Sequence, residues 1–177
     1  MIMRGDRIGL GQFTQEHSMR YLEWVNDSTI ATSLTRTLPV TEREHLKWYD
    51  SSVGRPDAVF FSVSHNETDE YLGNVWLWGL HTIHRSAELR ILLSPESAGK
   101  GFGTEACKLM LEFAFARLNL NKVFLYVWEN NTSARRTFEK AGFKEEARLI
   151  QEYYLEGRYQ DGLRMALLRQ DWHKAMA

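Results

Sequence analysis

Two predicted elements and a glycine-rich turn meet in the segment Leu89-Arg90-Ile91-Leu92-Leu93-Ser94-Pro95-Glu96-Ser97-Ala98-Gly99-Lys100-Gly101-Phe102-Gly103-Thr104. An apolar run leads through a short turn into three alternating glycines, and a long helix-forming stretch follows at once. Glycine lets a backbone approach a ligand closely and adopt a positive φ angle. The free N–H groups at a helix start, with the positive end of the helix dipole, hold anions. The segment therefore predicts a cradle for a phosphate or pyrophosphate group.

Two common nucleotide-binding motifs fit these glycines poorly. The P-loop pattern G-x-x-x-x-G-K-[ST] fails, because Gly99-Lys100 is followed by Gly101 and no glycine stands at the upstream position. The dinucleotide pattern G-x-G-x-x-G/A matches, with Glu129 as a ribose-binding acid, at Gly101, Gly103 and Ala106. In that motif, however, the glycines follow the strand directly, whereas residues 95–98 intervene here. A helix start without a ligand is a further alternative, although alternating glycines weaken a helix.

Two segments resemble one known family. Residues 98–103 are similar to the acetyl-CoA pyrophosphate loop of the GCN5-related N-acetyltransferases (GNAT family), written Q/R-x-x-G-x-G/A; Gly101 and Gly103 match its last fixed positions, and Ala98 stands where Gln or Arg is usual. Residues 131–143, Asn-Thr-Ser-Ala-Arg-Arg-Thr-Phe-Glu-Lys-Ala-Gly-Phe, resemble the family signature N-x-x-A-x-x-x-Y/F-x-K-x-G-F. The resemblance covers nearly the whole chain and is closest to the branch of ribosomal-protein N-terminal, spermidine and amino-sugar acetyltransferases.

Composition limits the classes of protein and of partner. A chain of 177 residues with 44% hydrophobic residues is expected to form one domain over residues 1–177. A net charge of −1 argues against a nucleic-acid partner. The single cysteine, Cys107, excludes an internal disulfide and suits a buried apolar role. The first ten residues lack the apolar run of a signal peptide, and no apolar stretch is long enough for a bilayer, so we expect a cytoplasmic protein without a membrane partner.

Periodicity and capping signals predict an alternation of strands and helices. Strands are expected over residues 7–13, 58–64, 72–79, 87–93, 122–128, 143–155 and 159–168, and helices over 14–25, 41–51, 104–118 and 133–141. The helix over 104–118 makes the strands at 87–93 and 122–128 parallel, whereas the other strands can pair antiparallel. The expected fold is therefore α/β. The resemblance implies a single-domain acyl-CoA N-acyltransferase (GNAT) fold, with a mixed, mostly antiparallel sheet, splayed central parallel strands and flanking helices.

The resemblance also implies a set of cofactor-binding residues. In the family the pantetheine arm lies between the splayed strands and pairs with the backbone of the strand before the glycines, which here contributes Ile91, Leu92 and Leu93. The pyrophosphate is expected at Gly99, Lys100, Gly101, Phe102, Gly103 and Thr104. Asn131 matches the family's asparagine after the second splayed strand, although capping the following helix is its other possible role. The expected cosubstrate is acetyl-CoA.

Glu88 is the candidate general base. It lies in the predicted strand before the glycines, where this branch commonly carries Glu, and a carboxylate there can accept the proton of an attacking amine. The alternative is a strand carboxylate paired with Arg90 or Arg85. We predict no metal site, because the spacing of His81 and His84 is a weak signal that no further ligand set completes.

The acid that protonates the leaving thiolate is not evident. Many family members use a tyrosine at the position that Phe138 occupies, and phenylalanine has no proton to give. We interpret Phe138 as a core aromatic residue. Either the thiolate leaves without a dedicated acid, or another tyrosine substitutes, the eligible residues being Tyr126, Tyr153, Tyr154 and Tyr159.

The sequence thus predicts an acetyl-CoA-dependent N-acetyltransferase that acts on a primary amine: a protein N-terminus, a polyamine or an amino sugar. A non-catalytic acyl-CoA-binding regulatory module is the alternative, since Phe138 and Ala98 both depart from the family pattern. A nicotinamide-dependent oxidoreductase ranks third. The expected partner is a small-molecule amine or a protein N-terminus, and a homodimer is possible.

Overall fold

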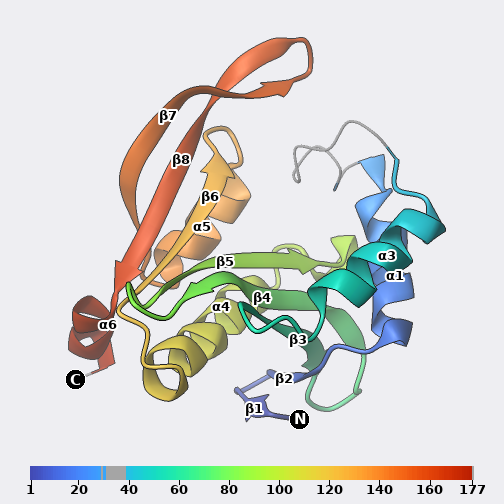
Figure 1. The fold of residues 1–177 in the computed structure, drawn as a ribbon, viewed down its shortest axis with the longest axis horizontal. Coiled ribbons are helices and arrows are strands. Elements are labelled where there is room, and N and C mark those ends of the chain that lie inside the picture. The colour runs from blue at the N-terminus through green and yellow to red at the C-terminus, as the bar shows by residue number, and fades with distance from the viewer. Residues whose placement is uncertain (29, 31–38, 177) are drawn as a thin grey trace.

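The computed structural model describes residues 1–28, 30 and 39–176, and within them one mixed sheet organises the fold (Figure 1). Its strand order is β1-β2-β3-β4-β5-β6-β8-β7. The strands are β1 (Met3–Arg4), β2 (Ile8–Gln12), β3 (Ala58–His65), β4 (Tyr71–His81), β5 (Ser86–Leu93), β6 (Lys122–Trp128), β7 (Lys144–Leu155) and β8 (Arg158–Leu168). All the strands predicted from the sequence are present, and β1 is an addition.

Five α-helices are described: α1 (Gln15–Val25), α3 (Glu42–Ser52), α4 (Phe102–Glu112), α5 (Thr132–Lys140) and α6 (Arg169–Met176). Capping confirms two predicted starts, because Thr14 caps α1, and Thr41 forms a capping box with Glu44 in α3. A 3₁₀ turn (Pro95–Ser97) precedes α4, and a π-helical turn (Phe113–Arg117) extends it. The prediction of a helix start at Thr104 was two residues late, because the helix begins directly after Gly101.

β5 and β6 form the parallel pair, and they separate along their length. They pair only at Ser86–Lys122, Ala87–Val123 and Glu88–Phe124, whereas the remaining strand pairs of the described sheet are antiparallel. Beyond Glu88, β5 continues beside β4 and β6 continues beside β8. The splayed strands expected from the sequence are therefore present, and the gap opens toward the carboxyl ends of both strands.

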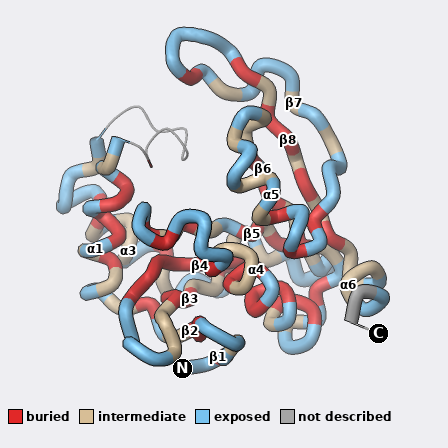
Figure 2. The backbone as a smooth tube through the Cα atoms, turned by 180° about the vertical axis from the view of Figure 1, so that it is seen from behind, coloured by how far each residue is buried: buried red, intermediate tan, exposed pale blue. Residues whose placement is uncertain are grey.

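The two faces of the sheet bury different cores. Buried residues recur along α1, along α4 and along the strands between them (Figure 2). On one face, Leu89 of β5 and Leu125 of β6 pack in a cluster with Met110 of α4. On the other, Trp76 of β4 and Leu92 of β5 pack in a cluster with the aromatic side chains of α1. Side chains alternate along a strand, so Glu88 and Arg90 lie on the face of Leu92. The candidate base therefore faces away from α4.

The hairpin of β7 and β8 extends away from the rest of the sheet (Figure 1). It turns at residues 156–157, as the sequence predicted. The helix α6 that follows β8 was not predicted, because no glycine or proline separates it from the strand. Trp172 of α6 packs against Phe115, with 5.5 Å between their ring centroids, so tertiary contact stabilises this short helix.

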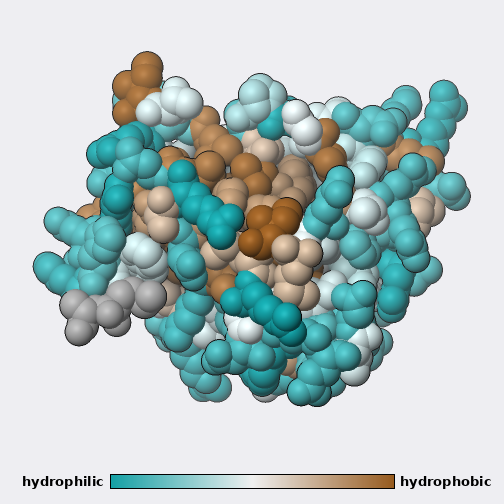
Figure 3. Space-filling view, turned by 90° about the horizontal axis from the view of Figure 1, so that it is seen from below, coloured by the Kyte–Doolittle hydropathy of each residue, from teal (hydrophilic) through white to brown (hydrophobic). Residues whose placement is uncertain are grey.

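One surface of the molecule mixes apolar and polar side chains. Seen from below in the orientation of Figure 1, apolar side chains gather near the middle, with hydrophilic side chains around them (Figure 3). None of the described helices is long and apolar enough to cross a membrane.

Candidate active site

The glycine segment forms a tight turn that ends at the start of α4. Gly99 has a φ angle of 74° and Gly101 one of 83°, a region that side chains disfavour. Gly101 is the residue that precedes the helix, and no side chain caps the helix there. The N–H groups of Phe102, Gly103 and Thr104 belong to the first helical turn, where no intrahelical acceptor exists. The turn therefore presents the donors that a pyrophosphate group requires.

Gly103 serves a different purpose from the other two glycines. A Cβ atom at this position would lie 3.2 Å from Cγ2 of Thr137 in α5. The Thr104 hydroxyl donates a long hydrogen bond of 3.5 Å to the Thr137 carbonyl oxygen. The absence of a side chain at Gly103 thus lets α5 approach the first turn of α4, and it brings the two motif segments together.

Arg7 comes from the N-terminal part of the chain and braces the glycine turn. Its Nη1 donates to the Lys100 carbonyl oxygen at 2.8 Å, and its guanidinium lies 4.9 Å from the centre of the Phe102 ring. The Glu105 carboxylate holds Arg7 through Nε at 3.2 Å and accepts the backbone N–H groups of Arg7 and Ile8. Sequence reasoning missed this residue, because 91 positions separate it from Ala98, where the family has its polar side chain.

The strand β5 leaves its β6 edge open next to this turn. Ile91, Leu92 and Leu93 pair with Val75, Asn74 and Gly73 of β4, and they lie beyond the last residue that pairs with β6. Their remaining backbone groups therefore border the gap between the two strands. This is where the sequence placed the pantetheine contacts, and those contacts stay a prediction.

α5 positions both residues that the second motif singled out. Asn131 caps the helix, because its Oδ1 accepts the backbone N–H of Ala134 at 3.1 Å. Phe138 is 7% exposed and packs edge-on against Phe143, with 6.1 Å between ring centroids. The structure therefore confirms Phe138 as a core aromatic residue. The proposed contact of Asn131 with the cofactor is untested.

Glu88 lies at the point where β5 and β6 diverge. Arg90 binds its carboxylate with two hydrogen bonds, from Nε to Oε1 at 2.7 Å and from Nη2 to Oε2 at 2.9 Å. The Glu88 side chain is 17% exposed and that of Arg90 is 46% exposed. The alternative role that the sequence offered, a pair with Arg90, is therefore present, while a role as general base stays a prediction.

A cavity of about 520 Å³ opens beside Glu88. β5, β6, β7 and β8 all contribute to its walls, through Glu88, Arg90, Tyr126, Ala147, Leu149, Glu152, Tyr153 and Arg164. Burial raises the pKa of the Tyr153 hydroxyl, and the nearby carboxylates of Glu152 and Glu88 raise it further. The phenol therefore stays protonated at neutral pH and remains a hydrogen-bond donor.

The structure separates the four tyrosines that the sequence named. Tyr126 and Tyr153 line the cavity. Tyr154 and Tyr159 pack against each other near the hairpin turn, with 5.1 Å between ring centroids, and are 57% and 65% exposed. Only the first pair lies beside Glu88, so the other two are poorly placed to serve the same reaction.

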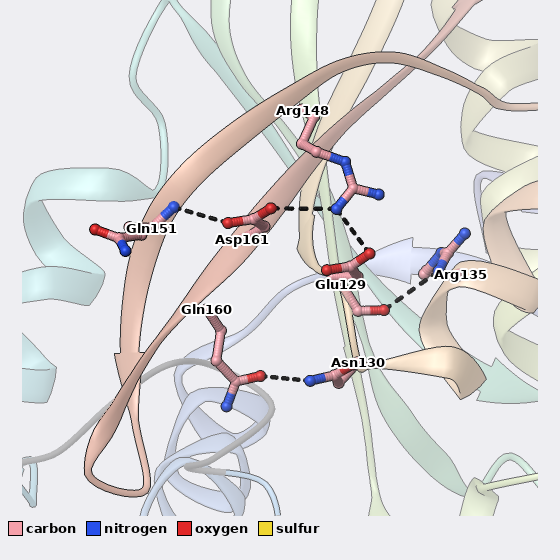
Figure 4. Close-up of polar contacts among 7 residues, drawn as sticks. All are labelled: Glu129, Asn130, Arg135, Arg148, Gln151, Gln160 and Asp161. Atoms are coloured by element: carbon pink, nitrogen blue, oxygen red, sulfur yellow. Dashed lines mark hydrogen bonds and ion pairs between the residues drawn. The ribbon is translucent and has the colours of Figure 1, made fainter.

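A polar network fastens the hairpin to the end of β6 (Figure 4). Arg148 of β7 binds Glu129 at 2.7 Å and Asp161 of β8 at 3.2 Å. The N–H of Gln151 donates to the other oxygen of Asp161 at 2.9 Å. Asn130, next to Glu129, donates to Gln160 at 2.7 Å. The wall of the cavity that β7 supplies is therefore tied to the loop that carries Asn131.

The sequence also singled out one cysteine, Cys107, and two histidines, His81 and His84. Cys107 is fully buried, and burial raises the pKa of its thiol to about 12, which agrees with the predicted apolar role. His81 and His84 stack on each other, with 4.1 Å between ring centroids. In the part of the chain that the structure describes, no group of three or more His, Cys, Asp or Glu side chains gathers to hold a metal ion.

Sequence reasoning missed Glu152, Asp161, Gly162 and Arg164 as parts of the site. One signal was available, because Gly162 lies inside a predicted strand, and an isolated glycine there indicates a bulge or a close approach of side chains. The other three residues carry no local pattern that separates them from solvated strand positions.

Comparison with known proteins places the chain in a family. The model of the acetyltransferase (GNAT) domain matches residues 7–144. Spermidine N(1)-acetyltransferase of Vibrio cholerae is 42% identical over 98 residues, which are 55% of this chain and 57% of that protein. The putative ribosomal N-acetyltransferase YdaF of Bacillus subtilis is 32% identical over 100 residues, 56% of this chain and 55% of that protein. The aligned stretch is thus a little over half the length of these curated relatives.

Solved structures agree over a longer span. The crystal structure of spermidine N-acetyltransferase from Vibrio cholerae in complex with CoA and spermine superposes with a TM-score of 0.87 and 29% sequence identity. The match covers 94% of this chain and 98% of that chain. The family model, the splayed parallel strands and this superposition lead to one conclusion: the chain belongs to the GNAT family of acetyltransferases.

Proposed function

We propose that this chain is an acetyl-CoA-dependent N-acetyltransferase that moves the acetyl group to a primary amine. One observation carries the proposal. The gap between β5 and β6 begins at the Glu88–Phe124 pair, next to the cavity, and the glycine turn follows the carboxyl end of β5. A cofactor that is held by its phosphates at the turn and lies along β5 presents its thioester beside the cavity.

The residues of the turn fit such a cofactor. The first turn of α4 has free N–H donors, and a side chain at Gly101 would meet the Arg7 guanidinium at 3.1 Å. We propose that Gly99 to Thr104 bind the pyrophosphate, that Ile91 to Leu93 pair with the pantetheine amides, and that Asn131 approaches the cofactor through its side-chain amide nitrogen. Arg7 adds positive charge next to the turn, at a site where Ala98 supplies none.

The chemistry at the cavity follows from Glu88. The neutral amine attacks the thioester carbonyl carbon, a C–N bond forms, and the C–S bond breaks. We propose that Glu88 accepts the proton that the amine loses, and that its pair with Arg90 orients the carboxylate. The thiolate then takes a proton from solvent or from a cavity tyrosine, because Phe138 is buried and has no proton to give.

For the acceptor we propose a polyamine in the first place. The Vibrio cholerae relatives carry spermidine in their names, and the cavity combines carboxylates with aromatic side chains, a combination that attracts ammonium groups. A protein N-terminus or an amino sugar is the second choice. A non-catalytic acyl-CoA-binding module is the competing function, and the engagement of Glu88 by Arg90 is the observation that favours it.

An acceptor panel tests the proposal. The protein is incubated with acetyl-CoA and, separately, with spermidine, a glucosamine derivative and a peptide with a free N-terminus, and the release of free thiol and the mass of each amine are followed. We expect a mass gain of one acetyl group on at least one amine. Tight CoA binding without turnover on any amine contradicts catalysis and supports the regulatory module.

Three further expectations accompany the proposal. Residues 1–177 act as one domain, the protein works in the cytoplasm, and it self-associates, as the dodecameric spermidine N-acetyltransferase of Vibrio cholerae does. Light scattering coupled to gel filtration tests the last of these, and a monomer at micromolar concentration contradicts it.

A further inference from the structure

An irregularity in β7 shapes one wall of the cavity. Leu149 pairs with Gly162 and Tyr153 pairs with Gln160, so residues 150–152 of β7 stand opposite a single residue of β8, Asp161. Within this bulge Gln151 has a φ angle of 54°, in the left-handed region that glycine favours. A glutamine holds this conformation only when its surroundings stabilise it.

Asp161 supplies that stabilisation. Its Oδ1 accepts the backbone N–H of Gln151 at 2.9 Å, and its Oδ2 accepts Nη1 of Arg148 at 3.2 Å (Figure 4). Arg148 is held in turn by Glu129 at 2.7 Å. The Gln151 N–H and the Arg148 guanidinium together keep the pKa of Asp161 below its usual range, so the carboxylate is charged at neutral pH.

The bulge changes which side chains face the cavity. In a regular strand alternate residues share a face, so Leu149 and Tyr153 would line the cavity and Glu152 would point away. Instead Glu152 and Tyr153, which are neighbours in sequence, both line it. Gly162 leaves the space for them, because a Cβ atom there would lie 2.9 Å from the Tyr153 ring and 3.2 Å from Cβ of Glu152.

Two carboxylates line this cavity, and Glu152 is the one without an ion-pair partner among the described residues. The Glu88 carboxylate is bound by Arg90. Arg164 also lines the cavity, and its Nε lies 3.3 Å from a carboxylate oxygen of Glu146, a residue that does not line the cavity. Among the residues that the structure describes, no cation lies within ion-pair distance of Glu152. The rings of Tyr126 and Tyr153 line the same cavity, and the Arg164 guanidinium lies 5.9 Å from the centre of the Tyr126 ring. A carboxylate next to aromatic rings is a suitable site for an ammonium group.

We propose that Glu152 is the residue that selects the acceptor, by binding a second ammonium group while the reacting amine lies beside Glu88. Asp161 is the positioning residue, which holds the Gln151 backbone so that Glu152 stays in the cavity. The inference rests on the proposed function and deepens it: the acceptor class is a diamine or polyamine rather than an amino sugar with a single amine.

The first test compares acceptors. Glu152→Gln is assayed with spermidine and with butylamine, which has a single amine. We expect the KM for spermidine to rise about tenfold or more, with the kcat for spermidine and the KM for butylamine within twofold of wild type. Glu145→Gln, on the same strand but outside the cavity lining, is the matched control and leaves both KM values unchanged. An equal rise for both amines, or no rise, overturns the assignment of Glu152.

The second test examines the positioning role. Asp161→Ala is expected to raise the KM for spermidine by a similar factor, with the affinity for CoA unchanged. Adding Gln151→Gly is expected to restore part of the loss, because glycine adopts a positive φ without support. If Asp161 has only a structural role, its substitution lowers Tm without changing the ratio of the KM for spermidine to the KM for butylamine. An unchanged ratio in Asp161→Ala, or no recovery in the double variant, overturns the positioning role.

The failure of this inference is distinguishable from failure of the proposed function. If the wild-type protein binds CoA but acetylates no amine, the proposed function fails. Glu152 is then judged by calorimetry of spermidine binding to the CoA-saturated protein, where Glu152→Gln must weaken binding about tenfold. Equal affinity of the two proteins, or no binding by either, overturns the inference.

Discussion

Arg90 binds both carboxylate oxygens of Glu88, at 2.7 and 2.9 Å, at the point where β5 leaves β6. A carboxylate held in this way has a defined orientation toward the cavity. An ammonium group that enters the cavity can also take the place of the Arg90 guanidinium at this carboxylate. The pair with Arg90 therefore positions the Glu88 carboxylate. It contributes little to the free energy of unfolding, because the Arg90 side chain is half exposed.

Glu88→Gln distinguishes the two roles proposed for this residue, a general base and an ion-pair partner of Arg90. If Glu88 is the general base, kcat/KM should fall by roughly 10²–10⁴-fold with the CoA affinity nearly intact. The loss should shrink at high pH, where more of the amine is already neutral. The pH–rate profiles of both proteins give the answer, and an unchanged profile with at most a small change in Tm indicates that Glu88 only pairs with Arg90.

Substitution of the loop glycines should weaken CoA binding. Gly101→Val forces a side chain into a φ angle of 83° beside Arg7, and Gly103→Val places one against Thr137. We expect the Kd for CoA to rise at least tenfold in both, by calorimetry. Gly54→Val is the control, since Gly54 has a similar φ of 87° with nothing within 4 Å. Folded variants with wild-type affinity would show that the pyrophosphate binds elsewhere.

Asn131→Asp distinguishes a helix cap from a cofactor contact. Aspartate caps as well as asparagine, so Tm should be unchanged. It replaces the amide nitrogen, a donor, by an anionic oxygen, so the affinity for CoA should fall several-fold if this side chain approaches the phosphates. Asn131→Ala should lower stability by about 1 kcal/mol through loss of the cap. Wild-type CoA affinity in the aspartate variant leaves Asn131 as a cap alone.

Phe138→Tyr should raise activity modestly or leave it unchanged. The new hydroxyl would enter a site that is 7% exposed and packed against Phe143. Burying it without a partner costs about 1–3 kcal/mol, which a thermal melt measures. A large loss of activity, rather than a small gain, would show that the ring is packed too tightly to take the place of the family's tyrosine.

Cys107 should not react with thiol reagents in the folded protein. Burial raises its pKa to about 12, so almost none of it is thiolate at pH 8, and its sulfur is inaccessible. We expect no reaction with Ellman's reagent until urea unfolds the chain. Reaction of one thiol per folded protein would contradict the buried position and would add a background to the thiol-release assay.

The sequence by itself determined the order of the strands and the helix between the parallel pair. Alternation in β4, the capping box of Thr41 and Glu44, and the glycines before α4 are local signals, and each depends on residues within a few positions of one another. The GNAT motifs also lie within short segments. For that reason the role of Gly101 in a turn and that of Phe138 in the core follow from the sequence, whereas the contact of Gly103 with Thr137 does not.

Tertiary structure alone decided the shape of the acceptor cavity. Gln151 adopts a left-handed conformation because Asp161, ten positions away on the next strand, accepts its N–H group, and no local pattern in residues 149–153 predicts a bulge. The place of Glu152 beside Tyr153 in the cavity depends on the same bulge, because a regular strand would turn one of two successive side chains away from the cavity. Arg7 reaches the glycine turn by a contact of the same kind. Register and cross-strand contacts join residues distant in sequence, and their energies exist only once the sheet has formed.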